Sequence, residues 1–172
     1  MYHLIVNPTA ARGRTGARLS RLCRALDAAG ISYEIHTSEY PDHAVELLAR
    51  IGGTARTVVA VGGDGTVNKT VNAARAHDVL LGVLPTGTGN DFAHQLGVAR
   101  LRDAIDTLKN GRERRFDVAE VSLLESRGTV LTRRFINTMG VGFDAAVGAR
   151  ARNHGGSGIL PYLAAVMHEL RV

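Results

Sequence analysis

The chain has 172 residues, 45% of them hydrophobic and 22% charged, which is the size and composition of one or two small folded domains rather than of a disordered chain. Aromatic residues make up 5% and tryptophan is absent. Few side chains are therefore available to stack on nucleic-acid bases, and we expect no nucleic-acid partner. Lysine and arginine exceed aspartate and glutamate by 21 to 16. Most of these cations are expected on solvated helix faces, and the excess suits phosphate groups or an anionic membrane surface.

The one cysteine, Cys23, excludes an internal disulfide and a paired-cysteine zinc site. Its spacing from Leu19, Leu22 and Leu26 predicts a helix face with a buried thiol. The short apolar start runs directly into Asn7, which is not the pattern of a signal peptide, and no apolar run approaches the ~20 residues that span a bilayer. We expect a cytoplasmic protein.

The first 110 residues alternate strand-like and helix-like segments. The expected strands are 2–6, 32–37, 57–61 and 80–84. Three helices are expected at 17–29, 91–96 and 101–110. Another is expected to begin after an N-cap at Asp42 and to end at Gly52 and Gly53. A fifth is expected to have Thr66 as its cap and to carry Val67, Val71 and Ala74 on one face. This alternation predicts an α/β fold with a doubly wound, mostly parallel sheet.

After Gly111 the pattern changes. Residues 116–124 and 129–138 predict two long strands, joined in an antiparallel hairpin by the turn at 126–128. A glycine-rich passage at 140–158 and a last helix at 159–171 follow. We therefore expect one domain over 1–111 and the unfinished start of a second, β-rich domain over 112–172.

The strongest motif is Gly62-Gly63-Asp64-Gly65-Thr66, between a buried strand and a helix. Glycines let backbone N–H groups approach a phosphate closely, and the start of a helix favours an anion. A carboxylate at Asp64 would repel that phosphate unless a divalent cation bridges the two or the carboxylate takes a proton from an attacking hydroxyl. The context favours a phosphate site over a structural turn.

Two further loops follow predicted strands, where α/β proteins bind ligands. Residues 7–16 join glycines to Arg12 and Arg14 before a helix, which is a possible anion site or an ordinary exposed loop. Residues 84–92 supply short polar side chains and a second carboxylate, Asp91. Asp91 either complements a helix dipole or shares a metal–water network with Asp64.

Other sequence patterns give weaker evidence of a binding or catalytic site. Neither lysine follows a glycine, which excludes a P-loop. Residues 140–145 match a dinucleotide-binding pattern but favour a tight turn, and 155–158 is not a nucleophile elbow. The seven histidines lack metal-binding spacings along the chain and are expected at the surface or as caps.

Residues 62–68 and 87–93, taken together, resemble the catalytic domain of diacylglycerol kinase-like lipid kinases, a family that includes sphingosine and ceramide kinases. Further matches are 7–8, Thr37, 116–118 and 137–144. The first motif is shared with NAD kinases and phosphofructokinases, and the second narrows the resemblance to lipid kinases.

The resemblance implies ATP as donor, Mg²⁺ as cofactor and a lipid hydroxyl, such as that of diacylglycerol, as acceptor. It makes 1–111 the nucleotide-binding domain and 112–172 the start of a lipid-binding domain. It implies catalytic acids that hold Mg²⁺ through water at Asp64, Asp91 and Asp117. The nucleotide contacts it implies are Asn7, Pro8, Thr9, Ala10, Ala11, Thr37, Gly63, Asp64, Gly65, Thr66, Val67, Asn68, Lys69 and Thr88.

The chain departs from the family in two ways. Lys69 stands where the family usually has glutamate, and the chain ends before the late acidic residue that the family uses as catalytic base. We expect a cytoplasmic enzyme at the inner face of the membrane, with homodimerisation through an uncovered apolar face of the second domain. Two alternatives stay open: an NAD kinase-like enzyme acting on a soluble nucleotide, and a non-catalytic nucleotide-binding fragment.

Overall fold

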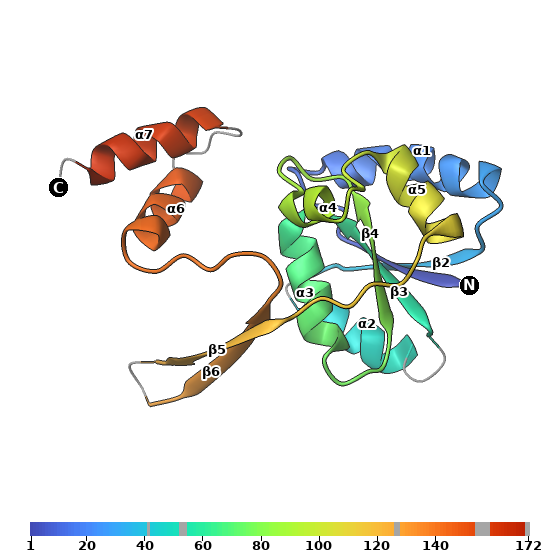
Figure 1. Cartoon of the computed structure of the whole chain (residues 1–172), viewed down its shortest axis with the longest axis horizontal. Coiled ribbons are helices and arrows are strands. Elements are labelled where there is room, and N and C mark those ends of the chain that lie inside the picture. Colours follow the sequence, from blue (N-terminus) through green and yellow to red (C-terminus); the bar gives the residue numbers. More distant parts are fainter. Residues whose placement is uncertain (41, 52–54, 126–127, 154–158, 171–172) are drawn as a thin grey trace. The chain divides into compact units, whose positions relative to one another are not determined.

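The computed structural model describes residues 1–40, 42–51, 55–125, 128–153 and 159–170 (Figure 1). Two compact units divide the chain, Met1–Ile136 and Asn137–Val172. The first unit contains a four-stranded parallel sheet with the order β2-β1-β3-β4. Its strands are β1 (Tyr2–Val6), β2 (Tyr33–Thr37), β3 (Thr57–Gly62) and β4 (Leu80–Pro85).

Helices alternate with these strands and cover both faces of the sheet, which confirms the predicted α/β class. They are α1 (Arg14–Ala28), α2 (His43–Ile51), α3 (Asp64–Ala74), α4 (Asp91–Gln95) and α5 (Leu101–Asn110). Side chains of β1 alternate between two apolar clusters. Leu4 and Val6 pack in the cluster that includes residues of α1, α4 and α5, and Ile5 packs in the cluster of α2.

Most predicted elements lie within a few residues of the observed ones, and three details are wrong. Helix α1 begins at Arg14 rather than at 17, because Gly13, with a φ of 82°, turns the chain into the helix earlier. Helix α3 begins at Asp64 with Gly63 as its N-cap and no side-chain cap, so Thr66 lies inside the first turn and is not the cap. Cys23 is half-buried rather than buried. The expected helix stop at 52–53 lies outside the described residues.

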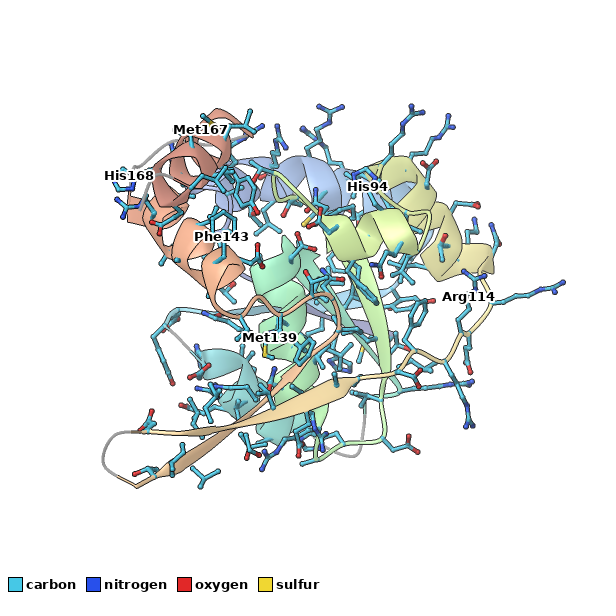
Figure 2. All side chains as sticks on the ribbon, turned by 60° about the vertical axis from the view of Figure 1, so that its left-hand side comes forward. His94, Arg114, Met139, Phe143, Met167 and His168 are labelled. Atoms are coloured by element: carbon cyan, nitrogen blue, oxygen red, sulfur yellow. The ribbon has the colours of Figure 1, made fainter. Side chains whose placement is uncertain are left out.

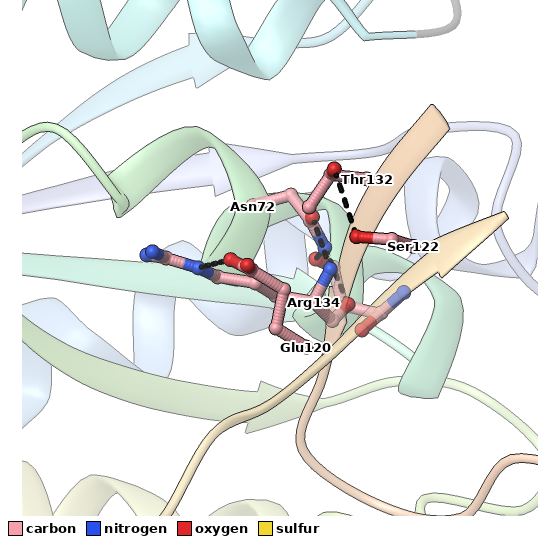
Figure 3. Close-up of polar contacts among 6 residues, drawn as sticks. Asn72, Glu120, Ser122, Thr132 and Arg134 are labelled. Atoms are coloured by element: carbon pink, nitrogen blue, oxygen red, sulfur yellow. Dashed lines mark hydrogen bonds and ion pairs between the residues drawn. The ribbon is translucent and has the colours of Figure 1, made fainter. Parts of the chain in front are cut away.

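The predicted antiparallel hairpin is present as β5 (Ala119–Leu124) and β6 (Val130–Phe135), shorter than expected at both strands. It belongs to the first unit because β6 contacts α3. The side-chain amide of Asn72 donates to the Arg134 carbonyl at 2.8 Å and accepts from the Arg134 N–H at 2.9 Å (Figure 3). The first unit thus continues beyond Gly111. Residues 126 and 127 of the predicted turn lie outside the described residues.

The second unit holds two helices, α6 (Phe143–Asn153) and α7 (Ile159–Glu169). Helix α7 agrees with the predicted last helix, whereas α6 lies within the glycine-rich passage, for which the sequence predicts no helix. It forms because alanines, the best helix formers, follow Gly142, whose φ of 66° makes the expected turn. Exposed apolar side chains on this unit include Met139, Phe143 and Met167 (Figure 2). Among the described residues, no helix has the length and apolar character to cross a membrane.

Candidate active site

A pocket of about 330 Å³ lies at the carboxyl ends of β1, β3 and β4. The three loops that the sequence singled out supply its walls. Its lining residues are Asn7, Ala10, Ala11, Gly63, Asp64, Gly65, Thr66, Lys69, Gly87, Thr88 and Gly89. The neighbouring order of the three strands in the sheet explains this convergence, since parallel strands bring the loops after them to one edge.

Backbone hydrogen bonds hold the first and third loops to the end of β3. The Asn7 N–H donates to the Val61 carbonyl at 3.3 Å, and the Thr86 N–H donates to the Gly62 carbonyl at 2.9 Å. A buried pair of hydroxyls, Thr15 Oγ1 and Thr86 Oγ1, lies 2.7 Å apart and connects the start of α1 to the loop after β4.

Glycine is required where the second and third loops meet. A Cβ built on Gly87 would lie 2.5 Å from the Gly63 Cα, a distance that real Cβ atoms do not adopt, and one on Gly63 would lie 3.2 Å from the Gly87 Cα. Gly65 differs, because a Cβ there would meet no atom within 4 Å. Gly65 is exposed in the first turn of α3 and lines the pocket, so its missing side chain leaves open space for a ligand.

Two carboxylates border this space. Asp64 Oδ1 accepts a hydrogen bond from the Phe92 N–H at 3.1 Å, which fixes the start of α3 against the start of α4. A Cβ built on Gly89 would lie 3.4 Å from Asp64 Oδ2 and 3.6 Å from Asp91 Oδ1. Both acids therefore adjoin the same short stretch of the third loop, beside the pocket.

Lys69 lies one turn farther along α3 and also lines the pocket. Within the described ranges it forms no ion pair, and its side chain is exposed. The pocket thus combines backbone groups at a helix N-terminus, the cation of Lys69 and the carboxylate of Asp64, with the carboxylate of Asp91 nearby, a set that suits a phosphorylated ligand with a metal ion.

The structure places the predicted site residues in two groups. Nine of the predicted contacts line the pocket: Asn7, Ala10, Ala11, Gly63, Asp64, Gly65, Thr66, Lys69 and Thr88. The others do not line it: Pro8, Thr9, Thr37, Val67, Asn68, Asp91 and Asp117. Val67 is buried in the core, and Thr37 ends the edge strand β2. Thr9 contributes indirectly, since its N–H and hydroxyl both donate to Asn7 Oδ1.

Asp117 is exposed and precedes β5. The preceding residue, Phe116, packs edge-on against Phe92 with ring centroids 5.5 Å apart. Because Phe92 follows Asp91 directly, this contact holds the segment with Asp117 near α4.

Five supporting residues lie outside the predicted contacts, although four of them belong to the third loop that the sequence singled out. Gly87 and Gly89 lie in the recognised third loop but were not assigned to the site. Asn90 adopts a left-handed conformation with a φ of 60° and donates to the Gly87 carbonyl, an arrangement that asparagine tolerates well. No sequence pattern predicts the contact between Thr15 and Thr86, because 70 residues lie between them and only the fold brings them together.

A larger hollow of about 650 Å³ lies on α2 and is lined by Glu39, Tyr40, His43, Glu46, Ala49 and Arg50. Its open, partly acidic surface lacks glycine loops and strand ends, and two glutamates oppose an anionic ligand. The smaller pocket is therefore the better candidate for a phosphate ligand.

Comparisons with known proteins identify the family of the chain. Residues 1–121 match the family model described as "Diacylglycerol kinase catalytic domain". The chain is 33% identical over 124 residues to "Diacylglycerol kinase" of Bacillus subtilis (strain 168), a match that covers 69% of this chain and 41% of the relative. It is 31% identical over 160 residues to "Putative lipid kinase YtlR" of the same organism, covering 87% of this chain and 50% of the relative. The chain thus spans half or less of the length of these relatives.

A solved structure of a diacylglycerol kinase from Bacillus anthracis str. Sterne is similar with a TM-score of 0.57 and 26% identity, over 79% of this chain and 48% of the other. The segment that the family model matches includes all three loops of the pocket, because it begins at residue 1 and ends beyond α5. From the residues matched and the fold they form, the chain belongs to the diacylglycerol kinase catalytic domain family of lipid kinases.

Proposed function

We propose that the chain supplies the nucleotide-binding part of an ATP- and Mg²⁺-dependent lipid kinase that phosphorylates a lipid hydroxyl such as that of diacylglycerol. The observation that carries the proposal is the open space at Gly65. It lies at the N-terminus of α3, between two glycine loops that approach each other closely. Backbone N–H groups at a helix start bind phosphate, and a missing Cβ lets the phosphate come near them.

The acids beside the pocket fit a magnesium ion. Mg²⁺ prefers oxygen ligands and retains several waters, so carboxylates a short distance away suit it as well as direct ligands do. Asp64 and Asp91 border Gly89 from two different helices, and Asp117 follows the Phe116 contact. When bound, the ion supplies neutralisation of the charge on the transferring phosphoryl group.

The chain's own residues do the rest of the positioning. Lys69 offers a cation to the phosphates from the second turn of α3, where the family usually has glutamate. The Phe92 N–H holds the Asp64 carboxylate in one orientation at 3.1 Å. Since phosphoryl transfer depends mostly on positioning and electrostatic stabilisation, a fixed carboxylate and a fixed glycine loop are the contributions expected of this part.

The lipid side of the reaction is proposed from the family alone. Residues 112–172 would begin the lipid-binding domain, and the whole enzyme would act on a lipid at the cytoplasmic face of a membrane. A homodimer through the exposed apolar side chains of this region remains part of the proposal. The activity of the 172 residues on their own is expected to be low, and nucleotide binding is the property to measure.

The first experiment is a calorimetric titration of the chain with Mg·ATP. Gly65→Val should abolish binding because its side chain would fill the open space, while the circular dichroism spectrum stays native. Gly148→Val is the matched control, since Gly148 is also helical and also has no atom within 4 Å of its Cβ position, but lies in α6. Equal ATP affinity in Gly65→Val and the original chain would refute the site.

The second experiment separates the metal role of Asp64 from phosphate binding. In the absence of Mg²⁺ the carboxylate repels ATP, so Asp64→Asn should bind metal-free ATP more tightly than the original chain. Added Mg²⁺ should then strengthen ATP binding much less in Asp64→Asn. Asp78→Asn, an exposed acid beyond α3, is the control. An unchanged Mg²⁺ effect in Asp64→Asn would exclude this role.

A further inference from the structure

We propose that His3, Glu34 and His36 form a binding site for one divalent transition-metal ion of the zinc type, which joins β1 to the edge strand β2. None of these residues lines the nucleotide pocket, and the proposed kinase reaction uses none of them. The proposal therefore stands or falls separately from the proposed function.

The parallel pairing of β1 and β2 brings the three side chains together. His3 is paired with Glu34, and Ile5 with His36. Alternate residues of a strand share a face, so His3 and His36 lie on the face of the sheet where Ile5 packs against the α2 cluster. This combination escapes motif searches because 26 residues separate β1 from β2 in the sequence, and only the register of the two strands makes the histidines neighbours.

The distances between donor atoms are those of a metal site. His3 Nδ1 lies 3.1 Å from His36 Nε2, within hydrogen-bond distance in the metal-free chain. Glu34 Oε2 lies 3.6 Å from His3 Nδ1, and Glu34 Oε1 lies 3.7 Å from His36 Nε2. Tetrahedral zinc with ligands at about 2.0–2.2 Å separates its ligand atoms by roughly 3.3–3.5 Å. Shifts of a few tenths of an ångström would therefore place an ion among all three groups.

The burial of the cluster also favours a specific site over a surface coincidence. His3 is 5% exposed, although we expected the histidines at the surface or as caps. His36 is half-buried, and Glu34 remains accessible to solvent. His3 thus approaches the site from the protein interior, and Glu34 from the solvent side. The solvent side leaves room for a water as the fourth ligand.

The ligand types select the class of metal. Two imidazoles and one carboxylate are a common set for zinc with an open fourth position, whereas Mg²⁺ and Ca²⁺ prefer oxygen ligands alone. The neutral imidazole is the form that binds a metal.

One neighbouring charge opposes the ion. Arg50 on α2 donates a hydrogen bond from its Nη2 to His43 Nε2 at 3.0 Å, and its positive charge acts on His36. Glu34 supplies the compensating negative charge. Neutralising Arg50 should therefore strengthen metal binding, an effect that a purely structural histidine pair would not produce.

The experiment is a titration of the untagged, metal-free chain with ZnCl₂ in competition with a chromophoric chelator. We expect one tight site per chain, and Co²⁺ in its place should give the visible absorption of a four-coordinate ion. His36→Gln should weaken zinc binding by at least ~100-fold and Glu34→Gln by ~10-fold or more, because each removes a ligand. His94→Gln, an exposed histidine of α4, is the control (Figure 2).

Two further measurements keep the proposal open to refutation. Since His3→Gln could disturb folding, His36→Gln and Glu34→Gln carry the test, each with a native circular dichroism spectrum. Arg50→Gln should bind zinc severalfold more tightly. Absence of a saturable site, or zinc affinity that is equal in the original chain, His36→Gln and Glu34→Gln, would overturn the proposal. ATP binding measured in parallel tests the proposed function independently.

Discussion

Strands β3 and β5 have six residues each and similar apolar content, yet they differ completely in burial. Five of the six residues of β3 are buried, whereas five of the six in β5 are exposed. Strand β3 lies between β1 and β4 and has helices on both faces, while β5 pairs with β6 in a two-stranded sheet. Leu124, at 76% exposed, shows the result. Neighbouring strands and covering helices, rather than apolar side chains alone, bury a strand.

The hairpin of β5 and β6 therefore depends on a few local attachments. Asn72 forms hydrogen bonds with both backbone groups of Arg134. It thus supplies to β6 the kind of backbone hydrogen bonds that a neighbouring strand supplies in the parallel sheet. The Phe116–Phe92 contact before β5 and the packing of Ile136 against the main core after β6 both hold the open end of the hairpin, opposite its turn. These contacts are sparse compared with the continuous core around β3.

The largest expected effect comes from removing equal side chains from the two regions. Leu4→Ala, at a fully buried position of β1, should lower the free energy of unfolding by about 2–5 kcal/mol. Leu124→Ala in β5 should change it by less than ~0.5 kcal/mol, because its side chain is already in water. Urea denaturation of both variants measures the difference. Similar losses would show that the hairpin is covered in solution.

A smaller effect is expected at the attachment of the hairpin. Asn72→Ala removes two hydrogen bonds to the backbone of Arg134 and should cost about 1–3 kcal/mol. Amide hydrogen exchange should become faster in β5 and β6 while β3 stays protected. Asn110→Ala is the control, because Asn110 donates to Asp106 on the exposed surface. Equal acceleration in β3 and the hairpin would show that the two regions unfold together.

The smallest effect is expected within the hairpin. Glu120 and Arg134 face each other across the strands, with Arg134 Nε 3.0 Å from Glu120 Oε2, and both side chains are accessible to water (Figure 3). Glu120→Gln should cost about 0.2–1 kcal/mol at low salt and less at high salt. The change in hairpin exchange rates at two salt concentrations measures it. A loss independent of salt would indicate that the contact acts through packing instead of charge.

The two regions also differ in what the sequence could predict. Strand β3 and helix α5 were predicted closely, because a continuous apolar run and a clear 3.6-residue period depend on local sequence. The predicted start of β5 and both predicted ends of β6 were wrong, since their alternation extends beyond the residues that pair, whereas the end of β5 at Leu124 was predicted correctly. Helix α6 was missed because flanking glycines obscured an alanine-rich helical segment.

For the candidate site, the sequence identified the three loops but not their internal contacts. Asp64 and the glycines around it follow a predicted strand, which places them at the sheet edge without knowledge of the fold. The close approach of Gly63 and Gly87 depends on the neighbouring positions of β3 and β4. The cluster of His3, Glu34 and His36 depends on strand register, which the sequence does not specify by itself.

The Thr15–Thr86 contact has a consequence for the thermodynamics of ligand binding. Its two hydroxyls are buried and 2.7 Å apart, so the loops after β1 and β4 are tied together before any ligand arrives. The loops therefore lose their conformational entropy when the chain folds. Binding of a nucleotide then costs little further loop entropy. A mutation at Thr15, which does not line the pocket, would consequently weaken nucleotide affinity, because the loops around the pocket would then have to be ordered on binding.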